Sequence, residues 1–581
     1  MQTLRGIPAS TGVARGPWVR IANVAAPAGG RISPDAAEAE IERLSIARDA
    51  AAAELEVLAA RLAAGGGDEG EIFDAQAAMA EDPMLLDAAS DRIREGHDAI
   101  GAIRMAAGTV ADELRGLGDE LLAARAADVL DVAERIAARL AGVDRAVTLA
   151  QPSIVVAEDI PPSLAAGLPR DRLLGLALEA GSATSHAAIL SRAFGIPAVV
   201  GVRGLLSATA ALDGPDLALD GDTGELILDP DEDTGVRLEE RRTAAAAAAE
   251  VALAEAGLPA VTRDGVEITL LANIGTPAEA GRAVALGARG VGLFRTEFLF
   301  VERSAPPTED EQTAANRAVV EAFAPGPVTI RLLDVGGDKP IPWLPIPPEA
   351  NPFLGVRALR LAPEQPELFV TQLRAAMRAA AASTDPGRPI GRVKVMAPMV
   401  ADASDVAILV DLATQARAGL RADRLPHGEV DLGVMLEIPS AVLTAATFFG
   451  RIRFASLGTN DLLQYTLAAD RGNAALERYR DPLHPAVLRL IAMAARYARV
   501  ASVELSVCGE MAGDPVAALA LIGLGVEVLS MADSSLAPVR RAIRGADASM
   551  LRTTAREAID AGSAAEVRER FAALRHLADP T

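Results

Sequence analysis

Residues 258–581 contain eight short apolar blocks typical of β-strands, and no other feature of the chain limits the fold as strongly. Helix-type sequence separates most of the blocks, and a closed (β/α)8 barrel is the most economical arrangement of such a pattern. In a barrel of this kind, the chemistry lies where the strands end. The blocks are Ile268–Asn273, Gly290–Thr296, Val328–Asp334, Val393–Met399, Leu432–Pro439, Phe454–Asp461, Glu504–Glu510 and Val526–Ala532.

The region before the barrel contains a block of helix-type sequence with no strand-like segment in it. Ser33-Pro34 supplies an N-cap and a first helical residue, and the glycines at 65–67 are expected to end the helix that follows. Apolar residues in that helix follow the four-three-four spacing of a packed helix face, at Ala51, Leu55, Leu58 and Leu62. Further helical segments are expected at 71–95, 98–115 and 119–142.

Strand-type sequence returns at Ser153 and again near 197–202 and 217–228, where a turn is centred on Gly221-Asp222. We therefore expect the helical block to be an insertion into an α/β domain. The expected organisation is an α/β domain of residues 1–25 and 145–230, a helical subdomain of residues 26–144, a linker helix within 231–257 and the barrel of residues 258–581.

Charge and cysteine content narrow the class of protein. The chain has 56 basic and 79 acidic residues, a net charge of −23, which argues against nucleic acid or an anionic membrane as the main partner. A single cysteine, Cys508, excludes an intramolecular disulfide framework and is consistent with a reducing cytoplasm. The first residues lack the apolar core of a signal peptide, and no apolar run reaches the length of roughly 18 residues typical of a membrane span. We expect a soluble cytoplasmic protein.

His186 is the candidate nucleophile. It lies between a turn and an apolar helical run, where a neutral imidazole could accept a phosphoryl group. Thr184 and Ser185 add hydroxyls, and the free N–H groups of a helix start favour an incoming anion. A structural histidine at a helix start remains the alternative at this level.

Three arginines near predicted strand ends, Arg295, Arg331 and Arg471, are candidates for an anion pocket, because each guanidinium can bind a carboxylate or phosphate with two hydrogen bonds. The alternative is that they form salt bridges. Glu437 and Asp461 each follow an apolar block, where a carboxylate needs a cation or a donor. They could hold Mg²⁺ or pair with buried arginines.

Cys508 also ends a predicted strand, and a glycine follows it. A thiol is mostly protonated at neutral pH and could donate a proton. The alternative is a small, inert core residue.

Taken together, these motifs resemble the enzyme I family of the bacterial phosphotransferase system, the phosphoenolpyruvate–protein phosphotransferases. The resemblance runs from Gly6 to about Gly545 in the domain order of the family. Its most specific segments are Thr184-Ser-His, Gly292-Leu-Phe-Arg-Thr-Glu-Phe-Leu-Phe, Asp334-Val-Gly-Gly-Asp-Lys, Asn351-Pro-Phe-Leu-Gly-Val-Arg, Gly458-Thr-Asn-Asp-Leu-Leu-Gln-Tyr and Cys508-Gly-Glu-Met-Ala-Gly-Asp.

The resemblance implies that phosphoenolpyruvate phosphorylates His186 at Nε2 and that Cys508 protonates the enolate to give pyruvate. It also implies that Glu437 and Asp461 hold Mg²⁺, and that the phosphoryl group passes to the carrier HPr, docked on the helical subdomain, as the first step of sugar uptake. Homodimerisation through the barrel is implied by analogy. The implied ligands of phosphoenolpyruvate are Arg295, Arg331, Asn460, Asp461 and Arg471, with Arg357 and Lys339 as weaker candidates.

The chain departs from the family at Ser182 and Ala183, where a glycine and a larger residue are common; neither change removes a reacting group. The nearest rival is a pyruvate phosphate dikinase or phosphoenolpyruvate synthase, which would need a nucleotide-binding domain in front. Two further alternatives are a regulatory paralogue that carries an N-terminal sensor domain, and a protein that serves as a scaffold without catalysis. The stretch before the helical block is short, and all the residue types that the reaction needs are present. Both observations favour the phosphotransferase.

Overall fold

The computed structural model describes residues 2–576 except 22–28, 64–69, 117–119, 144–147, 182–185, 211–215, 301–302, 304, 337–340, 342, 345, 348, 382–389 and 472. The chain forms two compact units, Met1–Ala249 and Glu250–Thr581. Each unit is described by itself.

The second unit is the predicted (β/α)8 barrel. Eight parallel strands form a closed ring in chain order, and β16 closes it by pairing with β9, with Leu529 opposite Leu270. Each strand matches one of the predicted blocks. The strands are β9 (Thr269–Ile274), β10 (Val291–Arg295), β11 (Val328–Arg331), β12 (Val393–Ala397), β13 (Asp431–Leu436), β14 (Phe454–Leu457), β15 (Glu504–Val507) and β16 (Val528–Met531).

Most strands end earlier than their blocks, and this changes where one candidate residue lies. β14 ends at Leu457 because Gly458 leads directly into helix α15 (Thr459–Leu467). Asp461 therefore lies in the first turn of a helix. The sequence had predicted it at the end of a strand. The first turn of a helix is a position that favours an acidic residue.

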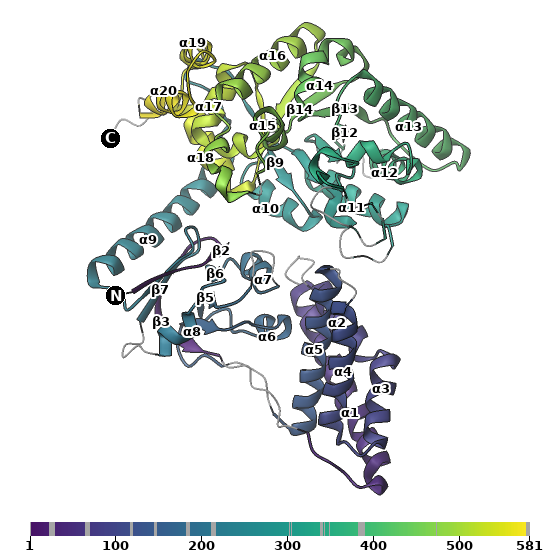
Figure 1. Cartoon of the computed structure of the whole chain (residues 1–581). Coiled ribbons are helices and arrows are strands. Elements are labelled where there is room, and N and C mark those ends of the chain that lie inside the picture. Colours follow the sequence, from purple (N-terminus) through teal and green to yellow (C-terminus); the bar gives the residue numbers. More distant parts are fainter. Residues whose placement is uncertain are drawn as a thin grey trace. The chain divides into compact units, whose positions relative to one another are not determined.

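Helices surround the ring of strands (Figure 1). The strands are buried on both faces, as in β12, where all five residues are buried, because side chains fill the barrel interior on one side and helices cover the other. The helices of this unit, besides α15, are α10 (Ala280–Ala285), α11 (Glu309–Ala322), α12 (Pro366–Ala379), α13 (Ala403–Ala422), α14 (Pro439–Thr444), α16 (Pro485–Ala501), α17 (Pro515–Gly523), α18 (Leu536–Gly545), α19 (Ala548–Ala558) and α20 (Ala564–His576).

The first unit contains an eight-stranded mixed sheet in the order β1-β8-β7-β3-β4-β5-β6-β2. β3 from the start of the chain pairs in parallel with β4, with Trp18 opposite Ile154. The helices between them are therefore an insertion, as predicted. The strands are β1 (Gln2–Arg5), β2 (Ile7–Ser10), β3 (Val13–Arg20), β4 (Ser153–Ala157), β5 (Leu173–Leu178), β6 (Ala198–Val200), β7 (Asp216–Asp220) and β8 (Glu225–Leu228).

Most of the first 25 residues form strands, although the sequence carried no strand signal there. β1 and β2 have only four residues each, and none of the residues of β1 and only two of β2 are buried, so they lack the apolar run by which a strand is recognised in a sequence. Gly6 separates them, and a Cβ there would lie 2.6 Å from the Val200 carbonyl oxygen. Glycine thus marks a close approach of two backbones.

Five long helices make up the insertion and lie side by side (Figure 1). The predicted 71–95 segment divides into two helices because Asp82 caps a new helix and Pro83 is its first residue. The insertion consists of α1 (Ala37–Ala63), α2 (Gly70–Ala80), α3 (Pro83–Arg94), α4 (Ala99–Gly116) and α5 (Glu120–Ala141).

The remaining helices of this unit are α6 (Pro162–Ala166), α7 (His186–Phe194), α8 (Leu205–Ala210) and most of α9 (Glu232–Ala254). The α9 helix is the predicted linker, and the boundary between the two units falls within it. No helix among the described residues is long and apolar enough to cross a membrane.

Candidate active site

The candidate residues of the barrel gather at the carboxyl ends of its strands. Arg295 and Arg331 are the last residues of β10 and β11, and Glu437 and Cys508 follow β13 and β15 directly. Asn460 and Asp461 lie in the first turn of α15. Because parallel strands point the same way, these side chains share one end of the barrel.

A buried network of charges occupies one side of this end. Arg331 is paired with Glu297 at 2.8 Å and with Asp334 at 3.2 Å. Arg357 binds the carboxylate of Asp334 with two hydrogen bonds, of 2.8 and 3.0 Å. All four side chains are almost completely buried, and burial of charges is tolerated only when they are paired in this way.

Arg357 extends the network to Asp461. Its guanidinium lies 3.4 Å from an Asp461 oxygen, and Arg471 approaches the same oxygen to 3.6 Å from the solvent side. Burial alone would lower the pKa of Arg357, but the neighbouring carboxylates raise it overall. Asp461 is therefore paired with two arginines in this structure.

Glu437 behaves differently. Only 1% of it is exposed, and its Oε1 accepts a hydrogen bond of 2.6 Å from the Met399 N–H. In the described part of the chain it forms no ion pair. Burial, together with repulsion from Asp334 and Asp461, raises the pKa of Glu437 to about 8. A cation at this point would relieve that repulsion.

Cys508 is 3% exposed and packs among apolar side chains inside the barrel. Its Sγ lies 3.7 Å from the Leu457 carbonyl oxygen. Burial raises the pKa of Cys508, and a hydrogen bond with Ser456 and the charges of Arg331 and Arg295 partly oppose this. The group is therefore a thiol at neutral pH, the protonation state that a proton donor needs.

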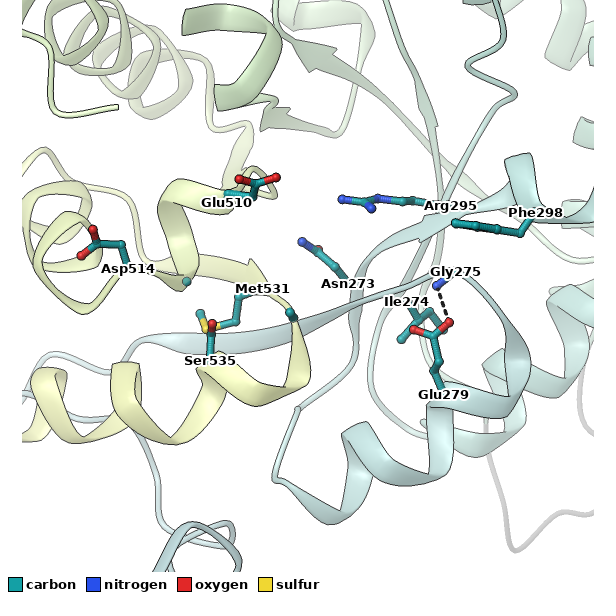
Figure 2. A pocket seen from close by; sticks show the side chains of 12 residues that line it. Asn273, Ile274, Gly275, Glu279, Arg295, Phe298, Glu510, Asp514, Met531 and Ser535 are labelled. Atoms are coloured by element: carbon teal, nitrogen blue, oxygen red, sulfur yellow. Dashed lines mark hydrogen bonds between the residues drawn. The ribbon is translucent and has the colours of Figure 1, made fainter. Parts of the chain in front are cut away.

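The other side of the barrel end is open. A cavity of about 520 Å³ lies there between the ends of β9, β10, β15 and β16. Arg295, Asn273 and Glu510 all point into the same space (Figure 2). Arg295 has no hydrogen-bond or ion-pair partner among the residues that the structure describes, so its guanidinium is available to an anion.

Asn460 joins the two sides. Its side chain donates to Glu510 Oε1 at 3.1 Å and accepts from the Glu510 N–H at 3.0 Å. The amide of Asn273 donates to the Cys508 carbonyl oxygen at 2.9 Å and accepts from the Ser530 hydroxyl. Two amides thus fix the backbone on both sides of the Cys508-Gly-Glu segment.

His186 belongs to the first unit and is the first residue of α7. The segment before it, with Ser182 and Ala183, and the candidate Lys339 lie outside the described residues. That His186 meets phosphoenolpyruvate in the barrel site therefore remains a prediction. His484 caps α16: its Nδ1 accepts a hydrogen bond of 3.2 Å from the Ala486 N–H.

Several residues of the site were not predicted as functional. Glu297 and Asp334 hold the arginines, Tyr465 bonds to Arg357 at 3.3 Å, and Asn273 and Glu510 line the cavity. A signal was present for four of them, since Asn273, Asp334 and Glu510 each end a predicted strand block and Glu297 follows Arg295 by two positions. Tyr465 carried no such signal.

Three family models together match most of the chain. They are the N-terminal domain of PEP-utilising enzymes at residues 5–125, the mobile domain at 149–224 and the PEP-binding domain at 250–548. The domain order and the barrel site therefore define a phosphoenolpyruvate-utilising enzyme.

Full-length relatives narrow this class. The chain is 43% identical over 570 residues to the phosphoenolpyruvate-protein phosphotransferase of Streptomyces coelicolor, covering 97% of this chain and 98% of the relative. The proteins of the same name from Geobacillus stearothermophilus and Bacillus subtilis are 38% and 36% identical, covering 94% of this chain and 93% and 94% of theirs. The chain belongs to the phosphoenolpyruvate-protein phosphotransferase family, and phosphoryl transfer from phosphoenolpyruvate is its chemistry.

Proposed function

We propose that this enzyme transfers the phosphoryl group of phosphoenolpyruvate to its own His186 and then to a histidine of an HPr-type carrier, as the first step of a sugar phosphotransferase system. The observation that supports this most directly is the pair of arginines available at the barrel end. Among the described residues, Arg295 has no partner and lines the cavity, and the buried Nε of Arg331 has no hydrogen-bond partner. A substrate that carries both a phosphate and a carboxylate would offer acceptors to both donors.

In the first step, the P–O bond of phosphoenolpyruvate breaks and a P–N bond forms at His186 Nε2. Arg295, Arg331, Asn460 and Arg471 bind the substrate and offset the charge on the migrating group, so the protein contributes mainly positioning and electrostatics. The enolate that leaves takes a proton from the Cys508 thiol and becomes pyruvate. The buried, protonated state of Cys508 supports this role.

Glu437 and Asp461 would hold Mg²⁺, and their surroundings fit a divalent cation. Glu437 has no ion-pair partner among the described residues, and burial together with repulsion from nearby carboxylates raises its pKa to about 8. Oxygen ligands are those that Mg²⁺ prefers. When bound, the ion would supply positive charge for the substrate phosphate. Asp461 would then share its carboxylate with Arg357 and Arg471.

The second step needs a carrier surface, which we assign to the helical residues 26–144. Since His186 lies in the first unit and the substrate site in the second, the segments near 145 and 230 and the α9 helix are the proposed hinges. Domain movement would then contribute to the turnover rate. We expect a cytoplasmic homodimer joined through the barrel.

Labelled phosphoenolpyruvate with Mg²⁺ tests the first step. The protein should take up a phosphoryl group in an acid-labile, alkali-stable bond. His186→Ala should abolish labelling. His427→Ala is the matched control, because the ring of His427 forms a hydrogen bond with the Leu425 carbonyl away from the site. Label that survives His186→Ala would overturn the assignment of the acceptor.

Two further experiments separate the alternatives. Cys508→Ala should phosphorylate slowly with an intact substrate site, and an unchanged rate would remove its role as the acid. ATP, phosphate and pyruvate together should yield no phosphoenolpyruvate, whereas a dikinase would make it. Mixing the phosphorylated protein with purified HPr-type and nitrogen-type carriers then identifies the acceptor.

A further inference from the structure

The C-terminal helix α20 reaches the active-site end of the barrel through one residue, Arg568. Its guanidinium binds Asp481 with two hydrogen bonds, of 2.9 and 3.1 Å, and Asp514 with one of 2.7 Å. These aspartates lie on different segments of the chain, between α15 and α16 and before α17. The family match ends at residue 548, so it does not include this helix.

Asp514 ends the segment that begins at Cys508. Its Oδ1 caps α17 by accepting from the Val516 and Ala517 N–H groups, while its Oδ2 binds Arg568. The side chain also lines the cavity, on the segment that follows Glu510 (Figure 2). Asp514 is thus fixed from two directions.

Between Cys508 and Asp514 the chain forms a 3-10 turn, Glu510–Gly513. The start of this segment is held by Asn273 at the Cys508 carbonyl, and its end is held by Arg568 at Asp514. Glu510 exchanges two hydrogen bonds with Asn460 between these points. Freeing the end of the segment would therefore let the Glu510–Asn460 pair shift.

Asp481 occupies a similar place on the other segment. Its Oδ1 accepts from the Leu483 N–H at 3.0 Å, next to His484, which caps α16. Arg471, a proposed substrate ligand, is ten positions earlier on this segment. Arg568 therefore joins the end of the Arg471 segment to the end of the Cys508 segment.

We propose that Arg568 is a positioning residue: it fixes the Cys508–Asp514 and Arg471–His484 segments relative to each other, and so sets the geometry in which phosphoenolpyruvate reacts. This rests on the proposed roles of Cys508, Asn460 and Arg471. The planar guanidinium suits the task because it binds two carboxylates at fixed angles, which an ammonium group cannot do. Burial would raise the pKa of Asp514, but the hydrogen bond from Arg568 lowers it overall.

α20 does not need Arg568 for its own docking. Val567 and Phe571 of the same helix are fully buried in the core of this unit, so Arg568→Gln should leave the helix in place. Arg570 provides a matched control on the same helix, because it pairs with Glu557 and Glu566 instead.

The test follows the rate of phosphorylation by labelled phosphoenolpyruvate in the full-length protein. Arg568→Gln should lower this rate about tenfold or more, since a displacement of roughly 1 Å can cost up to about a hundredfold, and KM should rise with it. Arg570→Gln should match the unaltered protein. Arg568→Lys should give an intermediate rate, because one ammonium pairs with only one aspartate well.

A second measurement separates positioning from general damage. Proteins phosphorylated beforehand are mixed with a purified HPr-type carrier, and discharge should be equally fast with Arg568→Gln, since this step does not use the barrel site. In an Asp514→Asn background, Arg568→Gln should add little further loss. An unchanged phosphorylation rate, or equal slowing of both steps, would overturn the proposal. If the unaltered protein took up no label, the proposed function itself would fail instead.

Discussion

The two sides of the barrel end are built in opposite ways. On the closed side, Glu297, Arg331, Asp334, Arg357 and Asp461 bind one another and are almost fully buried. On the open side, Arg295 points into a cavity of about 520 Å³ and has no charged partner in the described part of the chain (Figure 2). The closed side is largely paired before any substrate arrives, with the Nε of Arg331 and one oxygen of Glu297 left without a hydrogen-bond partner among the described residues, whereas the guanidinium of Arg295 on the open side has no partner there at all.

This difference indicates a division of labour. A closed network holds its dipoles and charges in place without reorganisation during the reaction, which is how enzymes stabilise developing charge. An unpaired arginine in a cavity gains its partner only when an anion binds. Stability should therefore depend on the closed side and substrate affinity on the open side.

The largest effect is expected from breaking the closed side. Arg357→Met removes the shared partner of Asp334 and Asp461 and leaves two buried carboxylates short of positive charge. Loss of one partner from a buried pair typically costs about 3 to 5 kcal/mol. Chemical denaturation of the barrel transition should show a decrease of this size. A decrease no larger than that of an exposed substitution would contradict the comparison.

Arg295→Met is the matching change on the open side, and its effect should fall on activity. No ion pair is lost among the described residues, so the free energy of unfolding should stay within about 0.5 kcal/mol. A hydrogen bond to a charged group is worth about 1.5 to 3 kcal/mol, which corresponds to a decrease in kcat/KM of about ten- to a hundredfold. Steady-state kinetics with varied phosphoenolpyruvate measures it, and a stability loss equal to that of Arg357→Met would remove the distinction.

Sequence patterns were sufficient for the barrel because its eight strands are buried on both faces and read as continuous apolar blocks, such as Val393–Ala397. They were insufficient for β1 and β2, which are four residues long and bury no residue and two residues, respectively. The exact strand ends were also missed. Asp461 belongs to a helix because the chain leaves the strand at Gly458, where a Cβ would approach Met435 and Glu437 to about 3 Å, and this close packing is not visible in the sequence.

The candidate site was predictable where residue type and position coincided. Arg295, Arg331 and Glu437 lie at strand ends as expected, since a charged residue closing an apolar block is conspicuous. The sequence could not predict which carboxylate pairs with which arginine, because partners such as Arg357 and Asp461 are more than a hundred positions apart in the chain. Only the folded barrel brings them together.

Glu437 lies on the closed side and forms no ion pair with any residue that the structure describes, and this exception predicts an effect of Mg²⁺ on stability. In metal-free protein, its pKa of about 8 exceeds the ordinary value of 4.5. The protonated form therefore contributes stability that is fully present below pH 4.5 and is lost as the pH rises through 8. Glu437→Gln should flatten this dependence.

Thermal unfolding at pH 8.5 in EDTA and in Mg²⁺ makes the comparison. The ion should raise the Tm of the unaltered protein, because an Mg²⁺ concentration of a hundred times the dissociation constant adds about 2.7 kcal/mol to the free energy of unfolding. The Tm of Glu437→Gln should rise much less. Arg295→Met should respond to Mg²⁺ as the unaltered protein does. Equal shifts in all three proteins would place the ion elsewhere.

The smallest expected effect concerns the pKa of Cys508, which depends on charges from both sides of the site. Burial raises the pKa of its thiol, and Arg331 from the closed side and Arg295 from the open side both lower it. Arg295→Met should therefore raise the pKa further and slow alkylation by iodoacetamide at pH 8 by a few-fold, because the thiolate is the reacting form. The rate profile from pH 7 to 10 separates this shift from a change in access, which would scale the rate equally at every pH. A profile that is not displaced would mean that the charge of Arg295 does not act on the thiol, and that the open side contributes space but no electrostatic influence on the acid.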